Sequence, residues 1–136
     1  MKKIVIVWIF LITILSSNWD YEVKLYEKVL PMVFKHMSIN AFVDKKTEEI
    51  LSNSKKITLV HNCKNADVLI GNSFENLIKD CKDKPIFGTT YRSFKKNLNY
   101  FGAFYWRKGR PQIRFRIDII EKHKLNLPQS LRKYAK

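Results

Sequence analysis

Two short apolar runs decide the fold of this chain: Ile57-Thr58-Leu59-Val60 and Asp67-Val68-Leu69-Ile70-Gly71. Both are rich in β-branched residues and too short for a helix, which favours buried strands of a mainly parallel sheet. Upstream, Ile39, Ala41 and Val43 alternate with other residues and predict another strand. Downstream, Pro85-Ile86-Phe87 predicts a short strand that ends at Gly88.

Helical patterns separate these strands. Over residues 20–37 apolar residues recur at spacings of three and four, which predicts an amphipathic helix. The expected stripe is Val23, Tyr26, Leu30, Val33, Phe34 and Met37. We expect Asp20 to cap this helix and Pro31 to kink or divide it. The polar stretch 44–54 is compatible with a second helix, and Ser73 is expected to cap a third that contains Asn76–Ile78.

The last third of the sequence predicts a β-hairpin. Residues 100–106 are strongly aromatic, Lys108-Gly109-Arg110-Pro111 is typical of a turn, and residues 112–117 alternate. Asp118 and Glu121 form a D-x-x-E pair that predicts a capped short helix. Pro128 is expected to start a last helical turn with Leu131 and Tyr134. We therefore expect an α/β fold: one small domain with a mainly parallel sheet, helices and a C-terminal hairpin.

The N-terminus resembles a secretory signal peptide. Lys2 and Lys3 precede an uncharged run from Ile4 to Leu15, and two serines follow. That run is shorter than the ~20 apolar residues of a membrane span. We expect residues 1–17 to be a signal peptide and residues 18–136 to form a domain outside the cytoplasm. An uncleaved membrane anchor stays open as an alternative, because Leu15 is large for a residue near a cleavage site.

Charge and cysteines point to the partners and the compartment. The formal net charge of +14 favours acidic partners, namely nucleic acid, anionic lipid headgroups or an acidic protein surface. Export makes nucleic acid the least accessible of these, so we expect a protein partner, with the anionic membrane surface as a further contact. Cys63 and Cys81 are expected to form a disulfide in an oxidising compartment. Two free thiols and a metal pair are the alternatives, although only His61 lies near either cysteine.

The sequence predicts no enzyme. His36, His61 and His123 stand far apart, and no Gly-rich phosphate loop, nucleophile elbow or zinc motif occurs. We therefore expect no catalytic residues, no cofactor and no metal.

The hairpin carries the most distinctive surface. Its basic and aromatic residues are Tyr105, Trp106, Arg107, Lys108, Arg110, Arg114 and Arg116. Such residues are favoured anchors of protein interfaces, and they also suit nucleic-acid binding or a charged strand edge that resists aggregation. We expect Tyr105, Trp106, Arg107, Arg110, Arg114 and Arg116 to bind a partner protein.

From Cys63 to its end the chain resembles the YfiR-like family of bacterial periplasmic proteins. The matching stretches are Cys63 with 67–71, 85–87, Phe101-Gly102-Ala103, 113–118 and the leucine-rich ending. Ala103 stands where that family has a second glycine. The resemblance implies a non-enzymatic regulator that binds the periplasmic sensor domain of an inner-membrane signalling protein, of the diguanylate cyclase or sensor kinase type. The alternative is a periplasmic binding module for a small anionic ligand.

Overall fold

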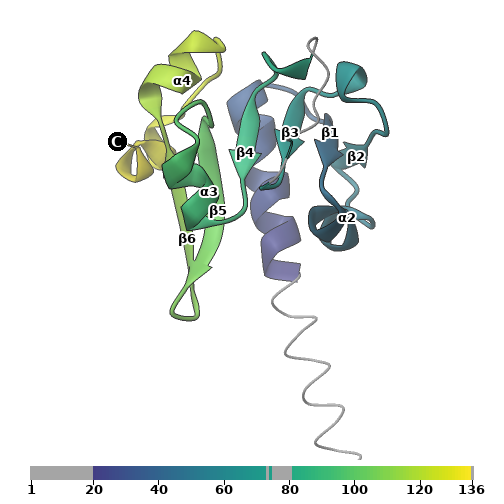
Figure 1. The fold of residues 1–136 in the computed structure, drawn as a ribbon, viewed down its shortest axis with the longest axis horizontal. Coiled ribbons are helices and arrows are strands. Elements are labelled where there is room, and N and C mark those ends of the chain that lie inside the picture. Colours follow the sequence, from purple (N-terminus) through teal and green to yellow (C-terminus); the bar gives the residue numbers. More distant parts are fainter. Residues whose placement is uncertain (1–19, 73, 75–80, 136) are drawn as a thin grey trace, which may run out of the picture.

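The computed structural model describes residues 20–72, 74 and 81–135 of the chain. Its strands form one sheet in the order β2-β1-β3-β4-β5-β6 (Figure 1). The strands are β1 (Ile39–Val43), β2 (Ile57–Leu59), β3 (Val68–Ile70), β4 (Ile86–Gly88), β5 (Gly102–Arg107) and β6 (Arg110–Phe115). Neighbouring strands are parallel except β5 and β6, which form an antiparallel hairpin. The predicted small α/β domain with a mainly parallel sheet and a C-terminal hairpin is confirmed.

Helices and 3₁₀ turns lie before, between and after the strands. Within the described residues, the helical segments include a helix over residues 20–34, α2 (Lys45–Leu51), α3 (Tyr91–Lys96), α4 (Ile117–Lys122) and the 3₁₀ turns η1 (Cys63–Asn65) and η3 (Gln129–Tyr134). The predicted signal peptide and the predicted helix at Asn76–Ile78, with its cap Ser73, lie outside the described residues. Within the described part of the chain, no helix has both the length and the apolarity to cross a membrane.

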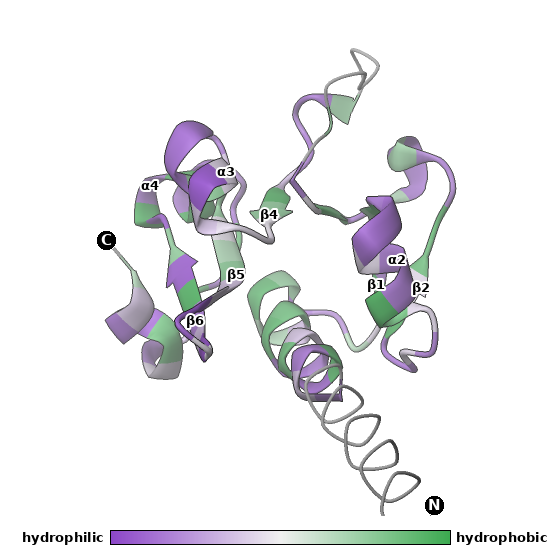
Figure 2. Ribbon diagram, turned by 60° about the horizontal axis from the view of Figure 1, so that its bottom comes forward, coloured by the Kyte–Doolittle hydropathy of each residue, from purple (hydrophilic) through white to green (hydrophobic). Residues whose placement is uncertain are grey.

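One face of the sheet, here called the core face, is covered by the helix over residues 20–34 and by α4 and η3 (Figures 1 and 2). Phe87 of β4 is fully buried there, and its ring centroid lies 5.4 Å from that of Phe101 and 6.3 Å from that of Phe115. Gly102 makes this approach possible, because a Cβ there would lie 2.9 Å from both the Phe87 and the Phe115 rings. The largest buried aromatic residues therefore gather on this face.

The opposite face, here called the cavity face, carries a smaller apolar cluster. Strand alternation turns Phe42, Leu69 and Ile86 to this side, where they pack with Tyr100 and Phe94. α3 lies on this face, since a Cβ at Gly88 would meet both Ser93 and Tyr100. α3 is mainly hydrophilic, whereas the helix over residues 20–34 on the core face is rich in apolar residues (Figure 2).

The helix over residues 20–34 confirms the predicted stripe through Tyr26, Leu30 and Val33, which are almost fully buried. Three details of the prediction are wrong. Asp20 is already helical, so it is not the cap, and Met37 lies beyond the helix end with 92% of its surface exposed. Pro31 does not divide the helix, because only three further residues follow it and the buried stripe continues on both sides.

Glu27 fastens this helix to the loop before β2. Its Oε2 accepts hydrogen bonds from Ser54 Oγ at 2.9 Å and from the backbone N–H groups of Lys55 and Lys56 at 3.2 and 3.3 Å. Burial alone would raise the pKa of Glu27, but these bonds outweigh burial and lower it.

The hairpin loop is shorter than predicted. Lys108 and Gly109 form a two-residue loop with φ values of 51° and 74°, the conformation that the strand twist favours. Arg110 and Pro111 therefore belong to β6 rather than to the turn. At the other end, β6 stops at Phe115, and Ile117 begins α4 instead of extending the strand.

The C-terminal helical segments differ in how well the sequence predicted them. Arg116 occupies the N-cap position of α4 with no side-chain cap bond, and Asp118 lies inside the first turn. The capping role predicted for Asp118 is therefore wrong, because the strand ends earlier than expected. The prediction for Pro128 is confirmed, since η3 begins directly after it and buries Leu131.

The predicted disulfide between Cys63 and Cys81 is present. The two Cα atoms lie 6.0 Å apart, within the usual span of a disulfide, and both side chains are buried. The bridge joins η1, which follows β2, to the segment that leads into β4. It therefore fixes the loop after the second strand, as expected.

Candidate functional site

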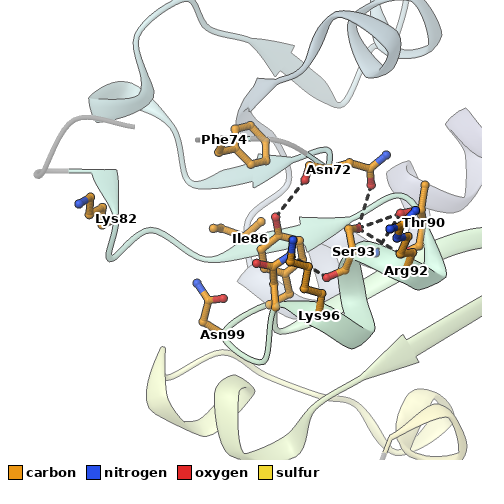
Figure 3. Close-up of a pocket in the computed structure, with 11 residues that line it drawn as sticks. Asn72, Phe74, Lys82, Ile86, Thr90, Arg92, Ser93, Lys96 and Asn99 are labelled. Carbon is orange, nitrogen blue, oxygen red and sulfur yellow. Dashed lines mark hydrogen bonds between the residues drawn. The ribbon is translucent and has the colours of Figure 1, made fainter. Parts of the chain in front are cut away.

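A cavity of about 610 Å³ lies on the cavity face over β4 (Figure 3). Its lining residues are Asn72, Phe74, Lys82, Ile86, Thr90, Arg92, Ser93, Lys96, Asn97, Asn99 and Tyr100. Figure 3 shows Lys82 and Asn99 toward one end and Thr90 and Arg92 toward the other, with Phe74 and Ile86 between them. A volume of this order is typical of small-molecule sites.

The charge of the lining is one-sided. Lys82, Arg92 and Lys96 bring three cationic side chains, whereas none of the described lining residues is a carboxylate. The remaining polar groups are amides and hydroxyls, which can donate hydrogen bonds. Such a lining favours an anion with a small apolar part, which Phe74 and Ile86 could contact.

Asn72 organises one end of this cavity. Its Oδ1 accepts hydrogen bonds from Thr89 N at 3.1 Å, Thr89 Oγ1 at 2.8 Å and Ser93 Oγ at 2.9 Å. A backbone N–H can only donate, so the amide oxygen must face Thr89. Thr90 caps α3 by accepting from Ser93 N at 3.1 Å. The N-terminal end of α3 is thus tied to the loop after β3.

Asp44 holds Asn72 in place. Its Oδ1 accepts from Thr47 N at 3.0 Å and caps α2, while its Oδ2 accepts from Asn72 N at 3.0 Å. Gly71 allows this contact, because a Cβ there would lie 2.5 Å from Asp44 Oδ2 and its φ is +153°. The carboxylate after β1 therefore positions the loop after β3, and that loop positions α3.

Arg116 holds the other end of α3. It donates hydrogen bonds to the carbonyl oxygens of Asn97 at 2.9 Å and Tyr100 at 3.0 Å, and to that of Phe94. Its guanidinium lies 3.8 Å from the centroid of the Phe94 ring. Burial lowers the pKa of Arg116, and the Asp118 carboxylate opposes that effect. The cation thus supplies donors to carbonyls in the last turn of α3 and in the segment that follows it.

α3 separates the cavity from a second depression. Arg92, Ser93 and Lys96 line the cavity, whereas Tyr91, Phe94 and Lys95 line a groove of about 290 Å³. The groove is completed by residues of the hairpin and its C-terminal extension: Tyr105, Arg114, Phe115, Arg116 and Asp118. One short helix therefore forms a wall of both depressions.

The residues predicted to bind a partner do not form one patch. Trp106 points to the core face, where it contacts Tyr21 and donates a hydrogen bond to Glu22. Tyr105 points to the opposite face, packs on Tyr91 at 5.4 Å between centroids and is almost fully buried. Strand alternation places these two aromatic residues on opposite sides of the sheet.

The arginines of the predicted patch also differ in their surroundings. Arg107 and Arg110 are exposed and face each other beside the loop, and Arg107 lies 5.7 Å from the Tyr91 ring. Arg114 is half-buried and lines the groove. Arg116 donates hydrogen bonds to three backbone carbonyls, so its guanidinium is used within the domain to hold the end of α3.

The potential chemistry of the histidines and cysteines is limited by their placement. Cys63 and Cys81 are joined in the disulfide, so neither is a thiolate. Burial and the neighbouring Lys122 lower the pKa of His123, while Asp83 raises it. In residues 20–72, 74 and 81–135, no group of three or more His, Cys, Asp or Glu side chains could hold a metal ion.

Sequence reasoning missed the cavity residues. Asn72, Thr89, Thr90 and Ser93 come from segments between strands, and α3 itself was not predicted because Tyr91–Lys96 has little apolar periodicity. One signal was present: polar residues follow β1, β3 and β4 within two positions, and the carboxyl ends of parallel strands meet at one edge of a sheet.

Comparison with known proteins supports the fold alone. No family model and no curated protein matches the chain. A conserved domain protein from Vibrio cholerae O1 biovar El Tor N16961 has a TM-score of 0.52 and 12% identity, over 87% of this chain and 59% of that chain. The ABC domain in complex with L-Trp from Streptococcus pneumonia has a TM-score of 0.52 and 13% identity, over 83% of this chain and 57% of that chain. The chain thus spans less than 60% of the length of either neighbour, and both share its α/β architecture.

Proposed function

We propose that this chain is a non-enzymatic binding domain for a small organic anion, a carboxylate or phosphate ester, held in the cavity beside α3. The observation that carries the proposal is the lining, in which Lys82, Arg92 and Lys96 stand without a carboxylate among the described lining residues. Apolar contacts from Phe74 and Ile86 would hold the carbon part of the ligand.

Two further observations support a binding role. The Asn72 network and Arg116 fix both ends of α3, so its cavity side chains are held before a ligand arrives, which lowers the entropic cost of binding. The Streptococcus neighbour is a complex with L-Trp, an amino acid with one carboxylate, on a related fold.

Isothermal titration calorimetry tests the proposal. The purified protein is titrated with inorganic phosphate, citrate, glucuronate and a nucleoside monophosphate. We expect one class of anion to bind, and the double variant Arg92→Gln/Lys96→Gln to bind it at least about 10-fold more weakly, since each lost charged contact contributes on the order of 1 kcal/mol.

The matched control is Lys24→Gln/Lys28→Gln. These lysines have the same spacing of four residues on a helix and are exposed, but they lie on the helix of the core face. Binding by the control should equal that of the wild type. An equal loss in both double variants would mean that net charge alone attracts the anion, and no binding of any anion would overturn the proposal.

A second candidate function is that of a periplasmic regulator, which docks on the sensor domain of an inner-membrane signalling protein of the diguanylate cyclase or sensor kinase type. The exposed Arg107 and Arg110 beside the hairpin loop and the partly exposed Trp106 favour this role. Anionic lipid headgroups could add a contact at the same cations.

Charge reversal tests this second candidate. The variant Arg107→Glu/Arg110→Glu should lose capture of a membrane signalling protein in a pull-down from envelope extracts, while anion binding in the cavity persists. Undiminished capture would contradict the second candidate and leave the cavity proposal standing.

A further inference from the structure

The groove on the other side of α3 has the composition of a peptide site. Its walls carry the rings of Tyr91, Phe94 and Tyr105, which come from α3 and β5. Tyr91 is 45% exposed although it is a large aromatic residue. The groove has a volume of about 290 Å³, less than half that of the cavity, which is enough for one or two side chains.

Cations surround these rings. Lys95 and Arg114 line the groove, and Arg107 lies over the Tyr91 ring. Asp118 is the acidic residue of the described lining, and it lies close enough to oppose the effect of burial on the pKa of Arg116. The groove thus combines aromatic rings with an excess of cationic side chains, which complements an acidic partner.

Hydrogen bonds within the strand orient the guanidinium of Arg114. Its NH1 donates to the carbonyl of Ile113 at 2.9 Å, and its NH2 contacts Gln112 Oε1 at 3.4 Å. These contacts lay the half-buried guanidinium along the strand beside the groove. Because a guanidinium carries five N–H donors, it retains donors for a carboxylate after making both contacts.

The adjacent sheet edge is closed, so a partner cannot simply add a strand to β6. The two-residue loop makes Arg107 and Arg110 a hydrogen-bonded pair, which turns the backbone of Pro111, Ile113 and Phe115 outward. Pro111 has no N–H to offer, the Ile113 carbonyl already accepts from Arg114, and Phe115 forms a bridge with Ala135. Recognition in this region must therefore use side chains in the groove.

A single-stranded nucleic acid fits less well. Binding of that kind relies on successive exposed ring faces. Here Tyr105 is 4% exposed, and one face of the Phe94 ring is covered by the Arg116 guanidinium. A peptide needs only one or two side chains to enter.

We propose that this groove binds a short acidic segment of a partner protein, which packs one aromatic or aliphatic side chain against the exposed ring of Tyr91 and pairs its carboxylates with Arg114 and Lys95. The inference rests on the second candidate function and names the partner chemistry for it. It is independent of anion binding in the cavity, because the two sites lie on opposite sides of α3.

A displayed library of random 12-residue peptides tests the inference. Selection against the purified protein should enrich peptides with Asp or Glu on both sides of an aromatic or aliphatic residue. Binding of an enriched synthetic peptide, measured by fluorescence polarisation, should fall at least tenfold in Tyr91→Ser, whose exposed side chain can be lost without unfolding. Arg114→Lys, which keeps the charge but loses the planar fork, should weaken binding about threefold.

The controls separate this inference from the others. Arg92→Gln/Lys96→Gln should bind the peptide as the wild type does, although it loses the anion. The inference would be overturned if the library enriched no peptides, or only peptides without acidic residues. Unchanged peptide binding by Tyr91→Ser would also overturn it. So would tighter binding of an oligo-dT 12-mer, if Tyr91→Ser abolished that binding. A wild-type protein that binds the peptide but none of the anions would instead overturn the cavity proposal alone.

Discussion

The two faces of the sheet are built differently. The core face is closed by the helix over residues 20–34 and gathers Phe87, Phe101 and Phe115 in one continuous cluster. The cavity face has a smaller cluster and is only partly covered by the short α3, beside which the cavity and the groove open. The difference indicates that one face supplies most of the stability while the other remains open for recognition.

The largest expected effect is on the core face. Phe87→Ala should lower the free energy of unfolding by about 3–5 kcal/mol, since it removes a fully buried ring from the centre of the cluster. Phe42→Ala, on the cavity face of β1, is the matched control and should cost about half as much, because Phe42 is only partly buried. Urea denaturation measures both, and equal losses would contradict the asymmetry between the faces.

The disulfide should come next. Replacing Cys63 and Cys81 by alanine opens a loop with a sequence separation of 18 and should cost about 3 kcal/mol, through greater freedom of the unfolded chain. Denaturation of the wild type with and without reductant gives the same comparison. Because the bridge acts mainly on the unfolded state, affinity for the anion should change little. A large loss of affinity with little loss of stability would contradict this account.

Removal of Arg116 should loosen α3 rather than the whole domain. Arg116→Ala leaves the carbonyls of Phe94, Asn97 and Tyr100 without this donor and should cost about 1–3 kcal/mol. Hydrogen exchange should speed up at α3 amides more than at β3 amides. Arg116→Lys should recover little, since one ammonium cannot reproduce the planar fork. Uniform acceleration across the sheet would show that Arg116 is no local clamp.

The smallest effect concerns Glu27 and pH. Its pKa is lowered in the folded protein, so the ionised form contributes stability above the unfolded pKa and loses it as pH falls through the folded value. The carboxylate lies at the surface and is partly exposed to solvent, so Glu27→Gln should cost less than about 1 kcal/mol at pH 7. Melting curves of wild type and variant should converge as the pH falls through the acidic range. A constant gap at all pH values would contradict the assigned cause.

Strands were the part of this fold that sequence could predict. The runs at Ile57 and Val68 and the alternation in β6 report burial directly, because strand periodicity depends on neighbours two residues apart. Pro31 misled because its helix-breaking cost is local, whereas the packing of Leu30 and Val33 that offsets it is tertiary. Sequence patterns include the local cost of the proline but contain no information on the tertiary packing.

The sites were harder to predict, because they depend on which segments meet. Arg114 and Arg116 look equivalent in an alternating run, yet β6 ends at Phe115, and Arg116 binds carbonyls at the C-terminal end of α3 and just beyond it. The Asn72 network joins residues 17 and 21 positions apart in sequence. Tyr105 and Trp106 were expected to act together, and the same alternation that predicted their strand places them on opposite faces.

Nuclear magnetic resonance titration of the ¹⁵N-labelled protein with the anion selected by calorimetry tests the central claim most directly. The claim is that recognition lies on the cavity face. Amide shifts should cluster at Asn72, Thr90, Ser93 and Lys96 and saturate together, while Leu30 and Val33 on the core face stay unchanged. Shifts confined to the core-face helix or to the hairpin loop, with none at Asn72 or Ser93, would contradict it.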